Sequence, residues 1–223
     1  MRMRSLAPEW RHSRVSKVTL ISVLDHAAVF VFALTGALTA SRAQLDVVGF
    51  TFMACITAVG GGTVRDILLN RTPVWMDQPS FLGLAVLAAV LVFFTAHLLE
   101  SRLKTIEWLD ALALGSAVAA GVGVALNMDQ PWPIVLVMGI ATSCLGGLMR
   151  DVVSNEVPLV LKQGELYVTC AVAGAGATLI ALECGMPQTS ALLLCAAVTL
   201  LLRAGSLLFA WKLPVYRSRP PRA

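Results

Sequence analysis

Charged residues are scarce in this chain: Asp, Glu, Lys and Arg together make up 13% of its 223 residues. Soluble domains carry about a quarter charged residues, so the composition argues against a large soluble domain. Hydrophobic residues make up 57%, and the mean hydropathy is +0.79. This combination predicts a protein that lies mostly within a membrane.

Motifs for catalysis and for metal binding are also lacking. The sequence contains no pairing of a nucleophile with a base and no phosphate-binding loop, and its five cysteines lack the spacing of metal ligands. The cysteines fall within or at the ends of apolar runs, where we expect them to pack as small apolar residues. The sequence therefore predicts neither an enzyme nor a protein with a resident metal or cofactor.

Apolar runs of membrane-spanning length fill most of the chain. A bilayer span needs roughly 20 apolar residues. The runs that qualify lie near residues 18–40, 45–69, 80–99, 106–126, 132–153, 166–184 and 189–211. Basic residues gather in an N-terminal arm over residues 1–17 and a C-terminal tail over 212–223. These flanks favour anionic lipid surfaces over nucleic acid, but seven spans put them on opposite sides, so charge alone does not set the orientation.

One polar motif occurs twice. Residues 60–66 read GGGTVRD, and residues 145–151, which lie 85 positions later, read LGGLMRD. At the same offset, residues 24–99 align with 109–184 without a gap, and the matches include Asp, Asn, Pro and Gln. Chance rarely aligns so many polar residues in one register, so we interpret the two segments as a duplication.

The duplication predicts the topology. Each half holds three spans, a first repeat over 18–99 and a second over 105–184. Three is odd, so the second half enters the membrane from the opposite side, as in many transporters. The span near 189–211 has no equivalent in the duplication, and we expect it to be a lipid-facing or subunit-packing helix. The predicted fold is an all-α polytopic membrane protein with two inverted three-helix repeats, a seventh helix, and kinked second and fifth helices.

Glycines stand where the second and fifth spans should simply continue. Consecutive glycines weaken a helix, so these positions are predicted kink or unwinding points whose freed backbone groups line an ion path. Close helix packing through small residues is the alternative interpretation. The Arg-Asp pair that follows both copies favours the functional one. The predicted kink residues are Gly60, Gly61, Gly62, Gly146 and Gly147.

Hydroxyl side chains lie one turn before the glycines, at Thr57, Thr142 and Ser143. Such hydroxyls often bond a carbonyl of the preceding turn. They can equally replace part of an ion's hydration shell. Both interpretations remain open from the sequence, and we include the three residues in the candidate ion path.

Arg65 and Arg150 lie near the ends of the second and fifth spans. An arginine within a span costs at least about 2.5–3.5 kcal/mol unless it reaches the interface or is paired. The topology puts Asp25 on the same side as Arg65, and Asp110 on the same side as Arg150. The sequence therefore predicts two acid–base pairs, one towards each membrane face, that flank a constriction and gate it.

Asp66 and Asp151 directly follow the two arginines. Adjacent residues of a helix point about 100° apart and pair poorly with one another. We therefore expect these two carboxylates to face water or a neighbouring helix rather than the arginine beside them.

Two three-helix repeats, each with Gly-Gly-x-x-Arg-Asp in its second helix, and a seventh helix resemble the trimeric intracellular cation (TRIC) channel family. The prokaryotic members, whose domain is also described as a glycine-transporter type, are the most similar. The resemblance covers residues 18–211. It implies a homotrimer in a prokaryotic plasma membrane, with one path for potassium or sodium ions inside each protomer and a cytoplasmic C-terminus.

Three functions are compatible with this sequence. The first is a homotrimeric potassium-permeable channel whose partners are its own copies, membrane lipids and monovalent cations. Bulky apolar side chains near the glycines would gate this channel by dewetting. The second is a secondary transporter of glycine or another small zwitterion, which inverted repeats and helix ends also suit. The third is a membrane scaffold that transports nothing.

Overall fold

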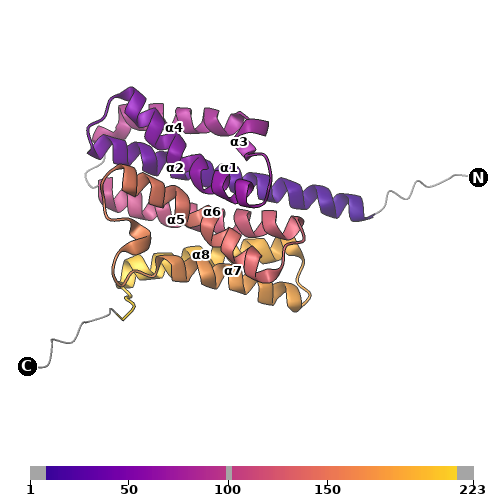
Figure 1. The fold of residues 1–223 in the computed structure, drawn as a ribbon. Coiled ribbons are helices and arrows are strands. Elements are labelled where there is room, and N and C mark those ends of the chain that lie inside the picture. The colour runs from indigo at the N-terminus through magenta and orange to yellow at the C-terminus, as the bar shows by residue number, and fades with distance from the viewer. Residues whose placement is uncertain (1–8, 99–101, 215–223) are drawn as a thin grey trace, which may run out of the picture.

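A computed structural model describes residues 9–98 and 102–214, and the regular elements within these ranges are all helices. The long helices lie roughly side by side in one bundle (Figure 1). They are α1 (Glu9–Arg42), α2 (Val47–Leu68), α4 (Ser80–Thr95), α5 (Arg102–Asn127), α6 (Trp132–Val153), α7 (Tyr167–Glu183) and α8 (Gln188–Phe209). The short ones are α3 (Val74–Asp77), η1 (Ala96–Leu98) and η2 (Leu159–Leu161).

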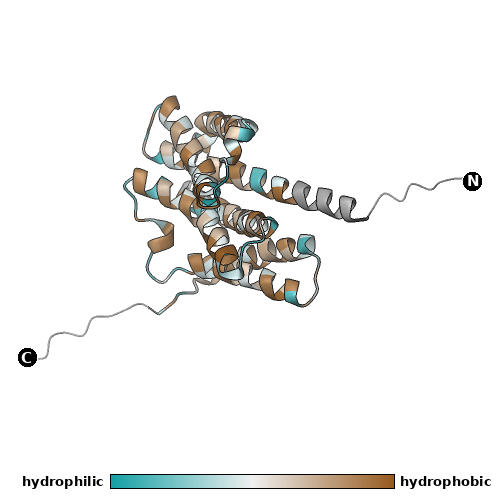
Figure 2. Ribbon diagram, turned by 45° about the vertical axis from the view of Figure 1, so that its right-hand side comes forward, coloured by the Kyte–Doolittle hydropathy of each residue, from teal (hydrophilic) through white to brown (hydrophobic). Residues whose placement is uncertain are grey.

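Among the described residues, six helices are long and apolar enough to cross a membrane, and α7, with 17 residues, is a shorter apolar helix. Apolar residues dominate the helices along their length (Figure 2). Large apolar side chains such as Phe94, Ile180 and Leu201 are exposed on the outside of the bundle. Since soluble proteins rarely expose apolar surface so widely, this exterior fits contact with lipid. The prediction of an all-helical membrane protein is confirmed.

The two predicted basic ends fall partly outside the described residues. Of the N-terminal arm over residues 1–17, residues 1–8 lie outside, and the backbone from Glu9 onwards belongs to α1. Of the C-terminal tail over 212–223, residues 215–223 lie outside. The start of the tail is attached to the bundle, because the backbone N–H of Leu213 donates to the carbonyl of Gly164 over 2.8 Å.

The helices of the two halves pack in the same pattern. In the first half α1 packs on α2 and α4, and in the second half α5 packs on α6 and α7. The halves meet where α1 contacts α5 and where α2 crosses α6. Helix α8 adds a further layer over α5 and α7, which makes α5 the most enclosed of the six long apolar helices.

The duplication extends to the backbone at the helix ends. Asn70 follows α2 and Asn155 follows α6, and both have a φ of 53°. Gln44 and Asp129, which precede the same two helices, have φ values of 55° and 51°. Residues other than glycine adopt this left-handed conformation infrequently, so its recurrence at equivalent positions shows that the two halves end and begin their helices in the same way.

Helices α2 and α6 run through their glycines as continuous α-helices. The predicted unwinding is therefore wrong, while the kinks stay a prediction, and packing gives the reason for the continuity. Gly61 lies against the backbone carbonyl of Thr142, and Gly146 lies against that of Thr57, so close that a Cβ on either glycine would collide with the opposing oxygen. The two contacts are equivalent at the offset of 85. The glycine segment of each helix thus packs directly against the backbone of the other helix, and this contact stabilises both.

Candidate functional site: two buried arginine–aspartate sites

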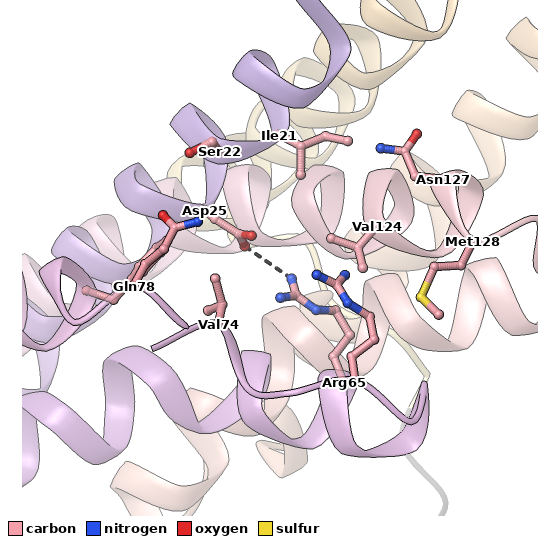
Figure 3. Close-up of a pocket in the computed structure, with 11 residues that line it drawn as sticks. Ile21, Ser22, Asp25, Arg65, Val74, Gln78, Val124, Asn127 and Met128 are labelled. Atoms are coloured by element: carbon pink, nitrogen blue, oxygen red, sulfur yellow. Dashed lines mark hydrogen bonds and ion pairs between the residues drawn. The ribbon is translucent and has the colours of Figure 1, made fainter. Parts of the chain in front are cut away.

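The first site joins α1 to the C-terminal end of α2. Arg65 is only 1% exposed, and its Nη1 donates to Oδ1 of Asp25 over 3.1 Å. Figure 3 shows the two side chains pointing towards one another in the lining of a cavity. The side chain of Asp25 is 14% exposed, so the pair is open to that cavity on one side.

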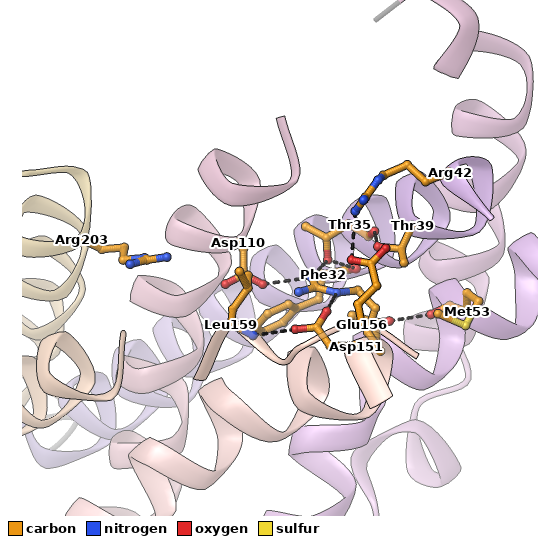
Figure 4. A network of polar contacts seen from close by, with 12 residues as sticks. Phe32, Thr35, Thr39, Arg42, Met53, Asp110, Asp151, Glu156, Leu159 and Arg203 are labelled. Atoms are coloured by element: carbon orange, nitrogen blue, oxygen red, sulfur yellow. Dashed lines mark hydrogen bonds and ion pairs between the residues drawn. The ribbon is translucent and has the colours of Figure 1, made fainter. Parts of the chain in front are cut away.

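The second site joins α5 to the C-terminal end of α6. Arg150 is also 1% exposed, and its Nη1 donates to Oδ1 of Asp110 over 3.0 Å. The same nitrogen donates to Oγ1 of Thr35 on α1 over 2.9 Å, which ties the second half to the first (Figure 4). Asp110 is fully buried, unlike Asp25. The structure thus brings together both predicted pairs, and the second is the drier of the two.

The carboxylates that follow the arginines are also part of the sites, so the expectation that they face away is wrong. Oδ1 of Asp66 and of Asp151 accepts from Nε of the preceding arginine over 2.9 and 2.7 Å. Oδ2 accepts from the backbone N–H of Val74 and of Leu159 over 3.0 and 2.9 Å. The arginine side chain is long enough to fold back along the helix, and the turn after the helix supplies the second donor.

Each site combines one arginine with two aspartates, which gives a formal charge of −1 when all three groups are ionised. Burying an ion pair is costly unless hydrogen bonds satisfy its remaining atoms. Backbone donors do so for Asp66 and Asp151, whereas Oδ2 of Asp110 is buried without a hydrogen-bond partner. A guanidinium nitrogen of Arg71 lies 4.0 Å from Asp66 at the first site, but that side chain is 38% exposed and screened by solvent. The residual negative charge favours a cation over an anion at the second site, and at the first site as far as solvent screens Arg71.

The candidate hydroxyls are bonded within their own helices. Oγ1 of Thr57 donates to the carbonyl of Met53, and Oγ1 of Thr142 to that of Met138, each over 2.6 Å. Oγ of Ser143 donates to the carbonyl of Ile140 over 3.0 Å. Of the two interpretations that the sequence left open, these bonds fit the local one, although each oxygen retains lone pairs that can accept.

Three cavities lie along the sites. A cavity of about 330 Å³, the wide mouth, is lined by the first site and by Arg71, Gln78 and Asn127. A cavity of about 20 Å³, the narrow mouth, lies at the second site. An inner cavity of about 20 Å³ is lined by Asp25, Arg65, Phe32 and Thr142. No group of His, Cys, Asp and Glu side chains in the described ranges is arranged to hold a metal ion.

Two further charged contacts were not anticipated from the sequence. Arg203 on α8 is 1% exposed, pairs with Oε2 of Glu165 over 2.7 Å, and lies over the ring of Tyr167. Arg42 at the end of α1 pairs with Glu156 after α6 over 3.0 Å. Arg203 is the single charged residue in the run 189–211, and an isolated charge in a span could have predicted a buried ion pair. Nothing in the sequence links Arg42 to Glu156.

Fold and sites together define a polytopic all-helical membrane protein built from two copies of one three-helix unit, each with a buried arginine–aspartate site. Residues 22–97 and 107–183 each match the family model described as "Glycine transporter". The chain belongs to this family. The two matched segments nearly coincide with the repeats predicted from the offset of 85.

Related sequences and solved structures support the same family assignment. A UPF0126 membrane protein of Vibrio cholerae is 35% identical over 89% of this chain and 83% of its own, and the inner membrane protein YadS of Escherichia coli is 33% identical over 88% and 96%. The TRIC channel orthologue of Rhodobacter sphaeroides is 37% identical, with a TM-score of 0.83 over 86% of this chain and 99% of that one. A prokaryotic TRIC channel solved in 0.5 M KCl is 25% identical, with a TM-score of 0.81 over 88% and 100%. The resemblance to TRIC channels is confirmed, and the two structural relatives are membrane channels rather than enzymes.

Proposed function

We propose that the chain forms a homotrimeric, potassium-permeable cation channel with one ion path inside each protomer. The observation that carries the proposal is that each site borders a cavity and that an inner cavity extends from the first site towards α6. The inner cavity touches Asp25 and Arg65 at one end and reaches Thr142 of α6, and the mouths open from either site. An ion would enter at one site, pass between α2 and α6, and leave at the other, without a cofactor.

Cation preference would come from the two sites rather than from the glycines. The carbonyls at the glycines belong to continuous helices, so they are not free to act as ion ligands. The formal charge of −1 at each site attracts cations, and Oγ1 of Thr142, which lines the inner cavity, retains a lone pair for a passing ion. Thr57 and Ser143 line none of the three cavities, so they would contribute only if the path opens around them. The pairs formed by Arg65 and Arg150 would act as the gating charges, since an ion can pass only where they separate.

The orientation follows from the duplication. We propose that the halves are inverted relative to one another in the membrane, which makes the two sites face opposite sides. The glycines would let α2 and α6 bend as the path opens. By the resemblance to TRIC channels we place the protein in a prokaryotic plasma membrane, with lipids around the bundle and the basic C-terminal tail in the cytoplasm.

A planar bilayer experiment tests this function. Purified protein should give discrete single-channel currents whose reversal potential follows the potassium gradient, with sodium as the comparison ion. The protein in detergent should have the mass of three protomers. Absence of current together with saturable uptake of labelled glycine into vesicles would replace the channel with a carrier.

A carrier for glycine or another small zwitterion is the second candidate, because the wide mouth offers charges of both signs. Asp25 could receive an ammonium group and Arg71 a carboxylate. A path with one wide and one narrow end also suits alternating access. Slow, saturable flux without unitary currents would favour it.

Phe32 supplies the bulky apolar side chain that gating by dewetting requires. It is 2% exposed, lines the inner cavity, and has Ala117 as its equivalent in the second half. We expect Phe32→Ala to raise potassium flux several-fold, because a smaller side chain lets water into the constriction. Phe52→Ala, on the exposed surface of α2, is the matched control and should leave the flux unchanged. Equal flux in both variants would remove Phe32 from the gate.

A further inference from the structure

The wide and narrow mouths are equivalent parts of the two halves. Both are lined by the arginine of their site, and further lining residues correspond at the offset of 85. These pairs are Ile21 and Ile106, Val74 and Leu159, and Val124 and Thr39. Yet one cavity is about 330 Å³ and the other about 20 Å³. Because the two mouths are lined by equivalent positions, their different cavity volumes must come from different side chains or from a different spacing of the helices.

The narrow mouth is spanned by an ion pair between the halves. Nη1 of Arg42, at the end of α1, donates to Oε2 of Glu156, in the turn after α6, over 3.0 Å (Figure 4). Both residues line the narrow mouth. A second pair at the same mouth, Lys162 to Glu107 over 3.3 Å, lies within the second half. The contact between Arg42 and Glu156 is therefore an ion pair that joins the two halves at this mouth, in addition to the hydrogen bond from Arg150 to Thr35.

The equivalent positions at the wide mouth cannot form this contact. Asn127 stands where the narrow mouth has Arg42, and Arg71 stands where it has Glu156. An amide and a guanidinium make no ion pair, and Asn127 instead accepts from Nε2 of Gln188 on α8 over 3.0 Å. The chain thus has the residues to close one mouth with an ion pair and lacks them at the other.

We propose that the ion pair between Arg42 and Glu156 is a gate specific to the narrow mouth, and that its absence at the wide mouth keeps that end open. The inference rests on the proposed function, since a gate implies a path. The pair is moderately exposed, at 31% and 36% of the two side chains, so its contribution is that of a surface ion pair. Breaking the pair should raise the equilibrium ratio of open to closed narrow mouth by about two- to fivefold.

The test measures access to the narrow mouth directly. A thiol introduced by Thr39→Cys lines this mouth, and its rate of modification by a charged, membrane-impermeant reagent reports opening. Site-resolved mass spectrometry separates it from the native cysteines. Adding Arg42→Asn, which copies the wide mouth, should raise the rate about two- to fivefold. Adding the charge swap Arg42→Glu with Glu156→Arg should return the rate towards that of Thr39→Cys alone, because the pair is restored.

Val124→Cys at the equivalent position of the wide mouth is the matched control, and its rate should not respond to Arg42→Asn. The converse pair of substitutions, Asn127→Arg with Arg71→Glu, should build the missing ion pair and slow modification there. An unchanged rate at Thr39→Cys when Arg42→Asn is added overturns the gate. Absence of potassium current in the unmodified protein overturns the proposed channel instead, and the accessibility result stands apart from it.

Discussion

Replacing Arg150 by methionine is expected to destabilise the protein by about 3–5 kcal/mol, because it leaves two buried carboxylates without their cation. Arg150 is 1% exposed, and it contacts Asp110 and Asp151 over 3.0 and 2.7 Å. Methionine keeps the length and apolar volume of the side chain, so the loss reports charge rather than packing. Chemical or thermal unfolding in detergent measures the change.

Three controls define this prediction. Arg42→Met removes a partly exposed arginine and should cost about 0–1 kcal/mol. Arg65→Met should cost less than Arg150→Met, because Asp25 borders the wide mouth and water can reach it. Adding Asp110→Asn to Arg150→Met should recover part of the loss. A stability of Arg150→Met within 1 kcal/mol of the unmodified protein would show that the network does not depend on the arginine.

Substitutions at neighbouring glycines of α2 are expected to have opposite effects. A Cβ at Gly61 would collide with the backbone carbonyl oxygen of Thr142 on α6, whereas a Cβ at Gly62 would meet only Nη2 of Arg65, at 3.8 Å. A backbone carbonyl cannot move aside as a side chain can. Gly61→Ala should therefore destabilise by about 1–3 kcal/mol or more, and Gly62→Ala should be neutral or stabilise by up to about 1 kcal/mol.

The second half repeats this experiment. Gly146 lies against the carbonyl of Thr57, and Gly147 meets its nearest atom, Oδ1 of Asp110, at 3.4 Å. Gly146→Ala should behave like Gly61→Ala, and Gly147→Ala should be much milder. The thermal midpoint and the fraction of monodisperse protein measure both pairs. Equal behaviour of Gly61→Ala and Gly62→Ala would mean that α2 and α6 do not cross at this point.

Much of the fold could be predicted from the sequence because duplication fixes register. Matching polar residues at one offset defined the two halves, and apolar runs placed the long helices. The alternation of span direction expected from the topology then suggested which aspartate lies near Arg65 and which near Arg150. These inferences need only topology, which chain length and span number largely determine.

The errors arose where tertiary packing decides. Glycine weakens an isolated helix, but Gly61 and Gly146 are held by the carbonyls that face them, so the helices continue. Asp66 pairs with Arg65 because a turn later in the chain supplies a donor for its second oxygen, which helical geometry alone does not reveal. Arg42 and Glu156 lie 114 residues apart, and no pattern in the sequence joins them.

The two oxygens of Asp66 and of Asp151 connect unlike parts of the molecule. One oxygen binds the buried guanidinium, and the other binds the first backbone amide of a short helix, at Val74 in α3 and at Leu159 in η2. A movement of either arginine away from its site is therefore transmitted by a single carboxylate to the turn beyond the long helix. A lipid or solute that displaced this turn would therefore also displace the carboxylate that binds the buried guanidinium at the end of the long helix.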